Sequence, residues 1–175
     1  MCMFKYCPSC ASEKINFEDE RLFRCPDCGF VYYHNTAAAT GCIISTGELI
    51  ALLVRAKEPA LGKLDLPGGF VDPGEGALEG LCRECREEIG WEPDISKVSL
   101  LASFPNKYLY KGISYNTCDL FFSVHVPGLS EKDFTLDLAE SSAVRFVKPS
   151  EIKLEDLAFD STRRAVEAYL ACLKG

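Results

Sequence analysis

The stretch GFVDPGEGALEGLCRECREEIGW, residues 69–91, decides how the rest of the chain is interpreted. At 100° per residue, a helix over 77–89 brings Glu84, Glu87 and Glu88 to one side. Apolar and thiol side chains at i, i+4, i+7 and i+11 form a separate stripe, which is typical of a face that packs on a core. The sequence therefore predicts an amphipathic helix with one carboxylate face.

This carboxylate face has two interpretations. One is a solvated acidic surface, because like charges at i, i+4 cost only a few tenths of a kcal/mol. The other is a cation site, since carboxylates that hold hard divalent cations can bind phosphate oxygens and activate water. The wider stretch fits G-x5-E-x7-R-E-U-x-E-E-x-G-U, in which U is hydrophobic. The residues at its fixed positions are Gly69, Glu75, Arg83, Glu84, Glu87, Glu88 and Gly90. At about 7% per residue type, such a coincidence is expected in roughly one of 10^8 windows.

The pattern resembles the signature of the Nudix hydrolases at every fixed position. The resemblance implies an α/β fold, an α/β/α sandwich with a mixed sheet, and hydrolysis of a nucleoside diphosphate linked to another moiety. It implies Mg2+ or Mn2+ as the catalytic cofactor. The catalytic residues that it implies are Glu84, Glu87, Glu88 and Arg83, and the implied metal ligands are the same three glutamates and the Gly69 carbonyl. Arg83 is expected to orient the helix and loop through an ion pair with Glu75.

Two matched Cys-Pro-x-Cys pairs precede this region, at Cys7, Cys10, Cys25 and Cys28. Four thiolates at this spacing can close a tetrahedral zinc site, which supplies folding energy that a short segment lacks. A secreted disulfide framework and a redox pair are the alternatives, but we expect no signal peptide, and the pairs are matched. The sequence predicts a structural zinc ribbon over 1–34, followed by a Nudix domain over 35–175.

The other cysteines are expected to have no role in metal binding. Two of them form a third Cys-x-x-Cys pair on the apolar stripe of the helix, where packing explains them better than chemistry. The cysteines expected to pack are Cys42, Cys82, Cys85, Cys118 and Cys172, and Cys2 is expected to be idle. So many free thiols are typical of a reducing compartment, which predicts a cytoplasmic location.

Composition limits the partners. A hydrophobic content of 47% is typical of a globular protein, and no apolar run approaches the ~20 residues that span a bilayer, so no membrane partner is expected. A net charge of −7 argues against a nucleic-acid partner. A small nucleotide remains compatible, because bound cations would reverse the local field. A homodimer is left open.

Hydrophobic periodicity predicts the remaining elements. The expected strands are 36–46, 48–56, 97–106, 113–126 and 142–149, with a hairpin over 17–25 and an amphipathic helix over 162–173. Strands alternating with two main helices predict a mixed sheet between helices.

The segment SFPNKYLYKG, residues 103–112, is the predicted substrate-binding segment. Aromatic rings can stack on a base and a lysine can attract phosphates. The candidate substrate-binding residues are Phe104, Tyr108, Tyr110 and Lys107. The alternative is a strand whose aromatic side chains are simply half-buried. Strand alternation predicts Tyr108 and Tyr110 on one face and Lys107 on the other.

The most favoured function is a metal-dependent pyrophosphohydrolase acting on ADP-ribose or an NADH-like dinucleotide. Glu140 falls where many Nudix enzymes have a late acidic residue, so it is a candidate magnesium or manganese ligand, with a surface loop glutamate as the alternative. The order of cysteine pairs and carboxylate helix resembles the NADH pyrophosphatases, although only the pair Phe104-Pro105 remains of their motif after the helix. A catalytically silent nucleotide-sensing Nudix domain is the second hypothesis. A nucleic-acid-binding zinc module is the third, and residues 1–34 show no basic surplus for it.

Overall fold

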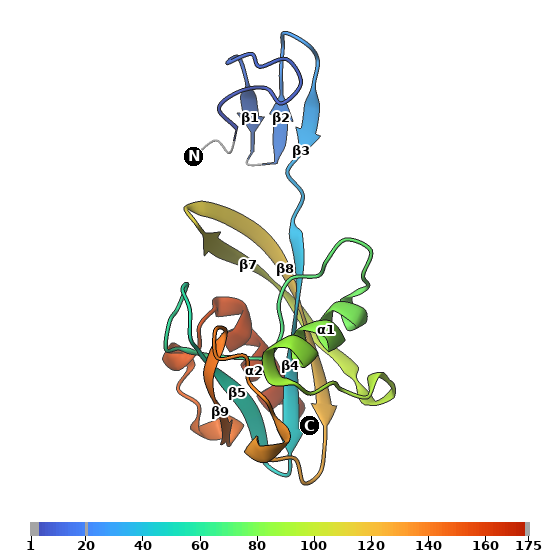
Figure 1. Cartoon of the computed structure of the whole chain (residues 1–175), viewed down its shortest axis with the longest axis vertical. Helices are drawn as coiled ribbons and strands as arrows, with labels where there is room; N and C mark the ends of the chain where they lie inside the picture. The colour runs from blue at the N-terminus through green and yellow to red at the C-terminus, as the bar shows by residue number, and fades with distance from the viewer. Residues whose placement is uncertain (1–3, 20, 174–175) are drawn as a thin grey trace.

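The computed structural model describes residues 4–19 and 21–173, and the expectation for Cys2 lies outside them. The first part is a three-stranded antiparallel sheet with the order β1-β2-β3 (Figure 1). Its strands are β1 (Asn16–Glu18), β2 (Leu22–Arg24) and β3 (Val31–Tyr33). The expected hairpin is confirmed as β1 and β2. Phe23 is fully buried and stacks on Phe17 with ring centroids 4.1 Å apart, so aromatic packing supports this small sheet.

A larger six-stranded sheet forms the body of the molecule. It has the order β6-β5-β4-β8-β7, with β9 paired to β5. The strands are β4 (Ala37–Thr46), β5 (Leu49–Arg55), β6 (Leu64–Asp65), β7 (Ser99–Tyr110), β8 (Ile113–His125) and β9 (Ser141–Val147). The pair β4 and β8 is parallel and the other pairs are antiparallel, so the predicted mixed sheet is confirmed. All of the predicted body strands are present.

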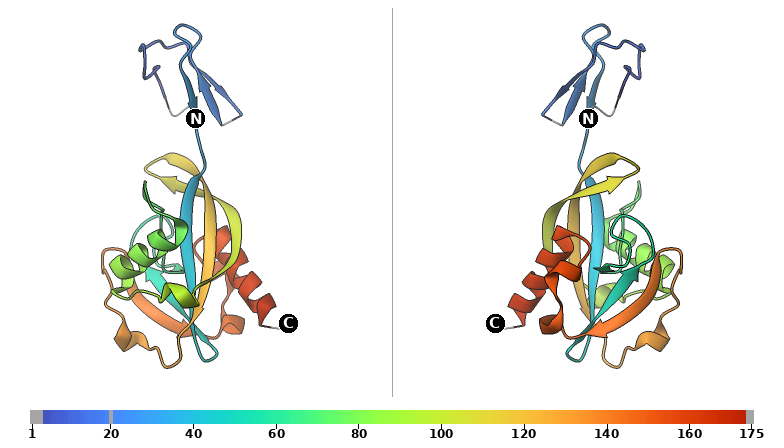
Figure 2. Two further views of the ribbon diagram at one scale, coloured as in Figure 1. Left: turned by 90° about the vertical axis from the view of Figure 1, so that its right-hand side faces the viewer. Right: turned by 90° about the vertical axis from the view of Figure 1, so that its left-hand side faces the viewer.

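Two helices cover opposite faces of this sheet (Figure 2). They are α1 (Ala77–Ile89) and α2 (Asp160–Cys172), and short 3-10 helices lie at Ile95–Lys97, Glu131–Asp133, Pro149–Glu151 and Leu154–Asp156. Alternate residues of β4 point to different sides, as strand geometry requires. Cys42 and Ile44 pack in the core beneath α1, whereas Ile43 packs in the core beneath α2. The predicted α/β/α sandwich is confirmed, and α1 has the predicted bounds.

Three of the cysteines predicted to pack are buried, and two are not. Cys42, Cys82 and Cys85 are at most 3% exposed, which confirms their packing. The prediction is wrong for Cys118 and Cys172, which are exposed. The core beneath α1 includes Leu120, Phe122 and Val124 from β8, whereas Cys118, on the same face of the strand, lies outside this core. Cys172 is the last residue of α2.

A tight loop between β6 and α1 runs antiparallel to β4. The backbone N–H of Thr40 donates to the Gly69 carbonyl at 2.8 Å, and Cys42 donates to the Pro67 carbonyl at 2.9 Å. Gly68 has φ 145, and a Cβ there would lie 2.1 Å from the Thr40 carbonyl oxygen. Only glycine therefore allows this close approach. The loop fixes where α1 begins relative to the sheet.

The predicted division of the chain at residue 34 falls between the end of β3 at Tyr33 and the start of β4 at Ala37, and it stays a prediction. No helix among the described residues is both long and apolar enough to cross a membrane.

Candidate active site

Arg83 organises the carboxylate face of α1. Its Nε and Nη2 donate to the two carboxylate oxygens of Glu75 at 2.8 and 3.0 Å, which confirms the predicted ion pair. Its Nη1 donates to Glu84 at 2.8 Å and to Glu87 at 3.0 Å. Its Nη2 also donates to the Phe70 carbonyl at 2.9 Å, so the same guanidinium ties the loop to the helix. Arg83 thus fixes the positions of two of the three helix glutamates.

Glu84 lies directly against the glycine loop. A Cβ at Gly69 would lie 2.5 Å from the Glu84 Cδ, so glycine is what leaves room for this carboxylate. Burial raises the pKa of Glu84, although the adjacent Arg83 works in the opposite direction. The Gly69 carbonyl, a predicted metal ligand, already accepts the Thr40 N–H and retains one lone pair for a further partner.

Glu88 is the most deeply placed of the three glutamates. Its Oε2 accepts a hydrogen bond from the Gly68 N–H at 2.9 Å. Burial raises the pKa of Glu88 to about 8, because this one hydrogen bond does not replace the water that the carboxylate loses. Glu87, by contrast, has a side chain that is 60% exposed. The helix therefore presents two half-buried carboxylates, those of Glu84 and Glu88, and the exposed carboxylate of Glu87.

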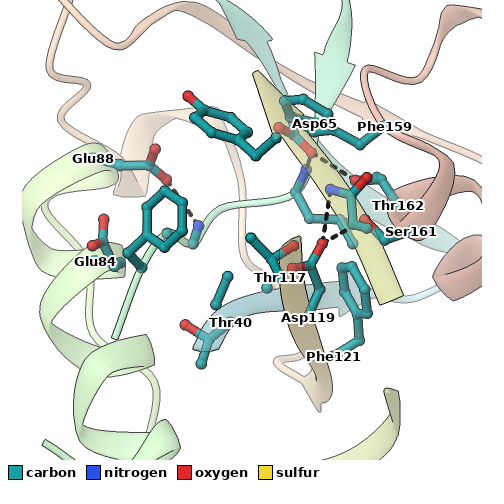
Figure 3. A pocket seen from close by; sticks show the side chains of 18 of the residues that line it. Thr40, Asp65, Glu84, Glu88, Thr117, Asp119, Phe121, Phe159, Ser161 and Thr162 are labelled. Atoms are coloured by element: carbon teal, nitrogen blue, oxygen red, sulfur yellow. Dashed lines mark hydrogen bonds between the residues drawn. The ribbon is translucent and has the colours of Figure 1, made fainter. Parts of the chain in front are cut away.

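These carboxylates line one end of a cavity of about 360 Å3. The cavity extends past the glycine loop to the start of α2, and Figure 3 shows Glu84 and Glu88 on one side of it and Asp119, Ser161 and Thr162 on the other. Glu140, in the turn before β9, also lines it, and its carboxylate pairs with Lys57. The structure thus brings Glu84, Glu87, Glu88 and Glu140 to a common cavity.

The donor set suits a hard divalent cation. Carboxylate and carbonyl oxygens are the ligands that Mg2+ and Mn2+ prefer. A bound cation would also stabilise the ionised form of the half-buried Glu88 carboxyl group, which forms no ion pair among the described residues. Arg83 Nη1 contacts one carboxylate oxygen of Glu84 and one of Glu87, so the second oxygen of each carboxylate stays available to such a cation. The residues present therefore fit the cofactor, and their roles as ligands stay predictions.

The predicted substrate-binding residues separate into two groups. Tyr108 lines the cavity, 5.4 Å from the Phe70 ring and 5.6 Å from the Phe159 ring. Tyr110 lies 6.4 Å from Tyr108 between ring centroids and is 45% exposed, beyond the cavity lining.

Phe104 and Lys107 do not reach this cavity. They line a second one of about 900 Å3, next to the start of α2. The Phe104 ring packs 6.2 Å from Phe121, with the Arg164 guanidinium 4.2 Å from its centroid. Phe104 is thus already engaged by the core, and its role in substrate binding stays a prediction.

Further polar residues that line the cavity were not predicted from the sequence. Arg55 pairs with Asp65 at 3.0 Å, and the Thr162 hydroxyl donates to Asp65 at 2.9 Å. Burial raises the pKa of Asp65 despite the adjacent Arg55. The Asn106 amide and the Ser161 hydroxyl both donate to Asp119. The available signal was the acidic residue at 119 within the apolar run of β8.

The four ribbon cysteines form a group that could hold a metal. Their sulfur atoms all lie within 4.8 Å of one another, and within the described ranges this is the only such group of cysteine, histidine or acidic side chains. The Cys7–Cys28 and Cys10–Cys25 sulfur distances are 3.6 and 3.7 Å. A tetrahedron with zinc–sulfur bonds of ~2.3 Å has sulfur atoms about 3.8 Å apart. The geometry is compatible with a closed structural zinc site.

We expect one zinc per chain in protein prepared without chelators, measured by elemental analysis. Replacing Cys25, which is 1% exposed, with serine should remove the zinc and unfold the ribbon, because a short segment depends on its metal for folding. Cys172→Ser is the matched control, since this exposed thiol lies on α2. A metal-free wild-type chain with a folded ribbon would contradict the zinc assignment.

The family of this chain is shown by a match to a protein-family model. The NUDIX domain family matches residues 35–169, which is most of the chain. This chain belongs to the NUDIX family. The match confirms the family predicted from the carboxylate helix, and it includes α1, all strands of the larger sheet and most of α2.

The alignments with curated relatives cover only part of this chain and part of each relative. An "NAD-capped RNA hydrolase NudC" from Stutzerimonas stutzeri is 33% identical over 86 residues, covering 49% of this chain and 31% of that protein. An "ADP-ribose pyrophosphatase" from Methanocaldococcus jannaschii is 36% identical over 77 residues, covering 44% of this chain and 45% of that protein. The matched region is thus less than half of either relative.

Solved structures agree in fold. A NUDIX hydrolase from Nitrosomonas europaea superposes with a TM-score of 0.66 and 26% identity, covering 96% of this chain and 91% of that one.

Proposed function

We propose that this NUDIX protein is a metal-dependent pyrophosphohydrolase that cleaves a nucleoside diphosphate linked to a second moiety. The observation that carries the proposal is the single cavity on which Glu84, Glu87, Glu88 and Glu140 all open. Carboxylates drawn from one helix turn and from the turn before β9 suit cations that bind a diphosphate. The names of the curated relatives, which include an ADP-ribose pyrophosphatase, support the same class of substrate.

The chain's own residues would hold and orient the diphosphate. A divalent cation at the carboxylate end would supply positive charge to the phosphate oxygens and lower the pKa of an attacking water. Arg55 lines the same cavity, and its buried Nη2 has no hydrogen-bond partner within the described part of the chain. A guanidinium N–H of this kind suits a phosphate oxygen of the substrate.

Glu84 or Glu88 would accept the proton of the attacking water. Both carboxylates have a raised pKa through burial, which makes each a stronger base than a solvated glutamate. Water would add across the bridging P–O bond and leave two monophosphates. Arg83 would act as a positioning residue, since it holds Glu84 and Glu87 beside the glycine loop.

A screen of nucleoside diphosphate derivatives tests this proposal. ADP-ribose, NADH and a 5′-NAD-capped RNA would be incubated with Mg2+ or Mn2+, with products identified by mass. The capped RNA is included because the names of the NudC relatives contain this substrate. The absence of a nucleic-acid partner stays a prediction, and cleavage of the capped RNA would contradict it. Two monophosphates from any of these substrates would support the proposal. Binding without cleavage would favour the silent sensing domain instead.

Tyr108→Ala should raise KM for the accepted nucleotide by about 5- to 100-fold, because base stacking is worth ~1–3 kcal/mol. Tyr108 is the predicted aromatic residue that lines the cavity. The contact forms equally in ground and transition states, so kcat should change little. Tyr110→Ala is the control, since that ring lies beyond the cavity lining. Unchanged KM for Tyr108→Ala with every accepted substrate would leave Tyr108 as a packing residue.

A further inference from the structure

The far end of the cavity contains a buried carboxylate that the proposed hydrolysis does not use. Asp119 is 8% exposed and lines the cavity from β8. Its Oδ2 accepts hydrogen bonds from Asn106 Nδ2 at 3.0 Å and from Ser161 Oγ at 2.6 Å (Figure 3). Its Oδ1 is buried and has no partner within the described ranges. The structure thus satisfies one oxygen of this carboxylate and leaves the other free.

A second unpaired oxygen lies on the same strand face. Thr117 precedes Asp119 by two residues, so both side chains point to one side of β8. The Thr117 Oγ1 is also buried without a hydrogen-bond partner. No lysine or arginine of the described chain forms an ion pair with Asp119. Buried polar atoms are nearly always hydrogen-bonded, and leaving one unpaired costs about 1–3 kcal/mol, more when it is charged. These atoms are therefore suited to a ligand.

The surroundings favour a flat ligand group. Tyr108, Phe121 and Phe159 contribute aromatic rings to the lining of this end. The neighbouring strand contributes small residues, since Ala39 pairs with Asp119 and Gly41 pairs with Phe121 in the β4–β8 register. The Phe121 ring lies over Gly41, because a Cβ at that glycine would come within 2.9 Å of the ring. The combination of aromatic rings and a buried acceptor on one cavity wall is what a nucleobase with a donor edge requires.

We propose that this end of the cavity is a base subsite, in which Asp119 accepts a hydrogen bond from an exocyclic amino group of the nucleobase. The inference rests on the proposed function, because it names the part of the nucleotide that lies away from the carboxylate helix. Adenine, guanine and cytosine each carry such an amino group. A base without an N–H donor would leave Asp119 Oδ1 unpaired and would bind more weakly.

Nucleoside binding without metal tests the subsite separately from hydrolysis. Dissociation constants would be measured by NMR titration of the full chain with adenosine, guanosine, cytidine and purine riboside, which lacks the amino group of adenosine. We expect the preferred amino-bearing nucleoside to bind ~10-fold or more tightly than purine riboside, the scale of a hydrogen bond to a charged acceptor. Affinity equal to that of purine riboside, or no binding of any amino-bearing nucleoside, would overturn the proposal.

Asp119→Asn distinguishes base recognition from a purely structural anchor. The amide keeps one oxygen for Asn106 and Ser161 and presents an N–H2 group where the free carboxylate oxygen lay. The preference over purine riboside should therefore fall to less than about 2-fold. Ser161→Ala is the matched control, because it removes a donor to Asp119 but keeps the free acceptor, so the preference should persist even if thermal stability falls. An unchanged preference in Asp119→Asn would make Asp119 an anchor of α2 only.

The two proposals fail in different ways. Nucleosides have no phosphate, so selective binding of amino-bearing nucleosides by a chain that cleaves no diphosphate would keep the subsite and reject the hydrolase. Cleavage of a nucleotide together with equal binding of purine riboside would keep the hydrolase and reject the subsite.

Discussion

Glu87→Gln is expected to lower kcat by about 10^2–10^3, the scale of losing one preorganised electrostatic group. The glutamine keeps the shape of the side chain but removes the charge that would hold a cation. The fold should persist, because the Glu87 side chain is 60% exposed and its ion pair with Arg83 is a surface contact. Steady-state kinetics at saturating Mg2+ or Mn2+, with far-UV circular dichroism as a check on folding, would measure the change.

The matched control for this loss of charge is Glu167→Gln. Glu167 is exposed on α2 and lines neither cavity, so its replacement removes the same charge at a distance from the carboxylate face. Its kcat should stay within about 2-fold of wild type. Near wild-type turnover by Glu87→Gln under these conditions would reject the assignment of the α1 glutamates as the metal site.

Gly68→Ala is expected to destabilise the protein by ~3 kcal/mol or more, which corresponds to a fall in Tm of about 6–12 °C. Gly68 has φ 145, a conformation that L side chains rarely adopt. The new Cβ would lie 2.1 Å from the Thr40 carbonyl, so the loop would have to leave β4. Glu88 would lose the Gly68 N–H at the same time, so activity should fall further than stability alone explains.

Gly62→Ala separates backbone strain from this close approach. Gly62 also has a positive φ, of 78, but no atom lies within 4 Å of the position that its Cβ would take. Its replacement should therefore cost only the conformational strain of about 1–2 kcal/mol. Differential scanning calorimetry of both variants would measure the difference. If both variants lost the same free energy of unfolding, the close approach of Gly68 to Thr40 would contribute nothing to the cost of Gly68→Ala.

Local pattern was enough to predict the helix and its carboxylate face. The bounds of α1 follow from spacing within one short segment, whereas the ion pair of Arg83 with Glu75 was expected from the resemblance to the Nudix signature. Gly90 has φ 61, as the predicted end of the helix requires. Periodicity also predicted five of the six body strands, whereas the two-residue β6 was not predicted and β7 continues four residues beyond its predicted end at 106.

The far end of the cavity could not be predicted in this way. Asp119 becomes part of a site only because β7 pairs with β8 and the start of α2 packs over both, which brings Asn106 and Ser161 to it. These contacts join residues that are distant in sequence, and no periodic pattern encodes them. Phe104 illustrates the converse, since its ring suits a base by type but packs against Phe121 and Arg164.

The most direct test of the central claim is a turnover experiment on ADP-ribose in water enriched in oxygen-18, with and without Mg2+ or Mn2+, and with products analysed by mass. The proposed hydrolysis predicts AMP and ribose 5-phosphate in equal amounts, one of them carrying a single oxygen-18, and no products when the cation is chelated. If ADP-ribose is not hydrolysed, NADH and NAD-capped RNA would be tested in the same way. Intact substrate throughout, with cation bound and nucleotide affinity retained, would contradict the account.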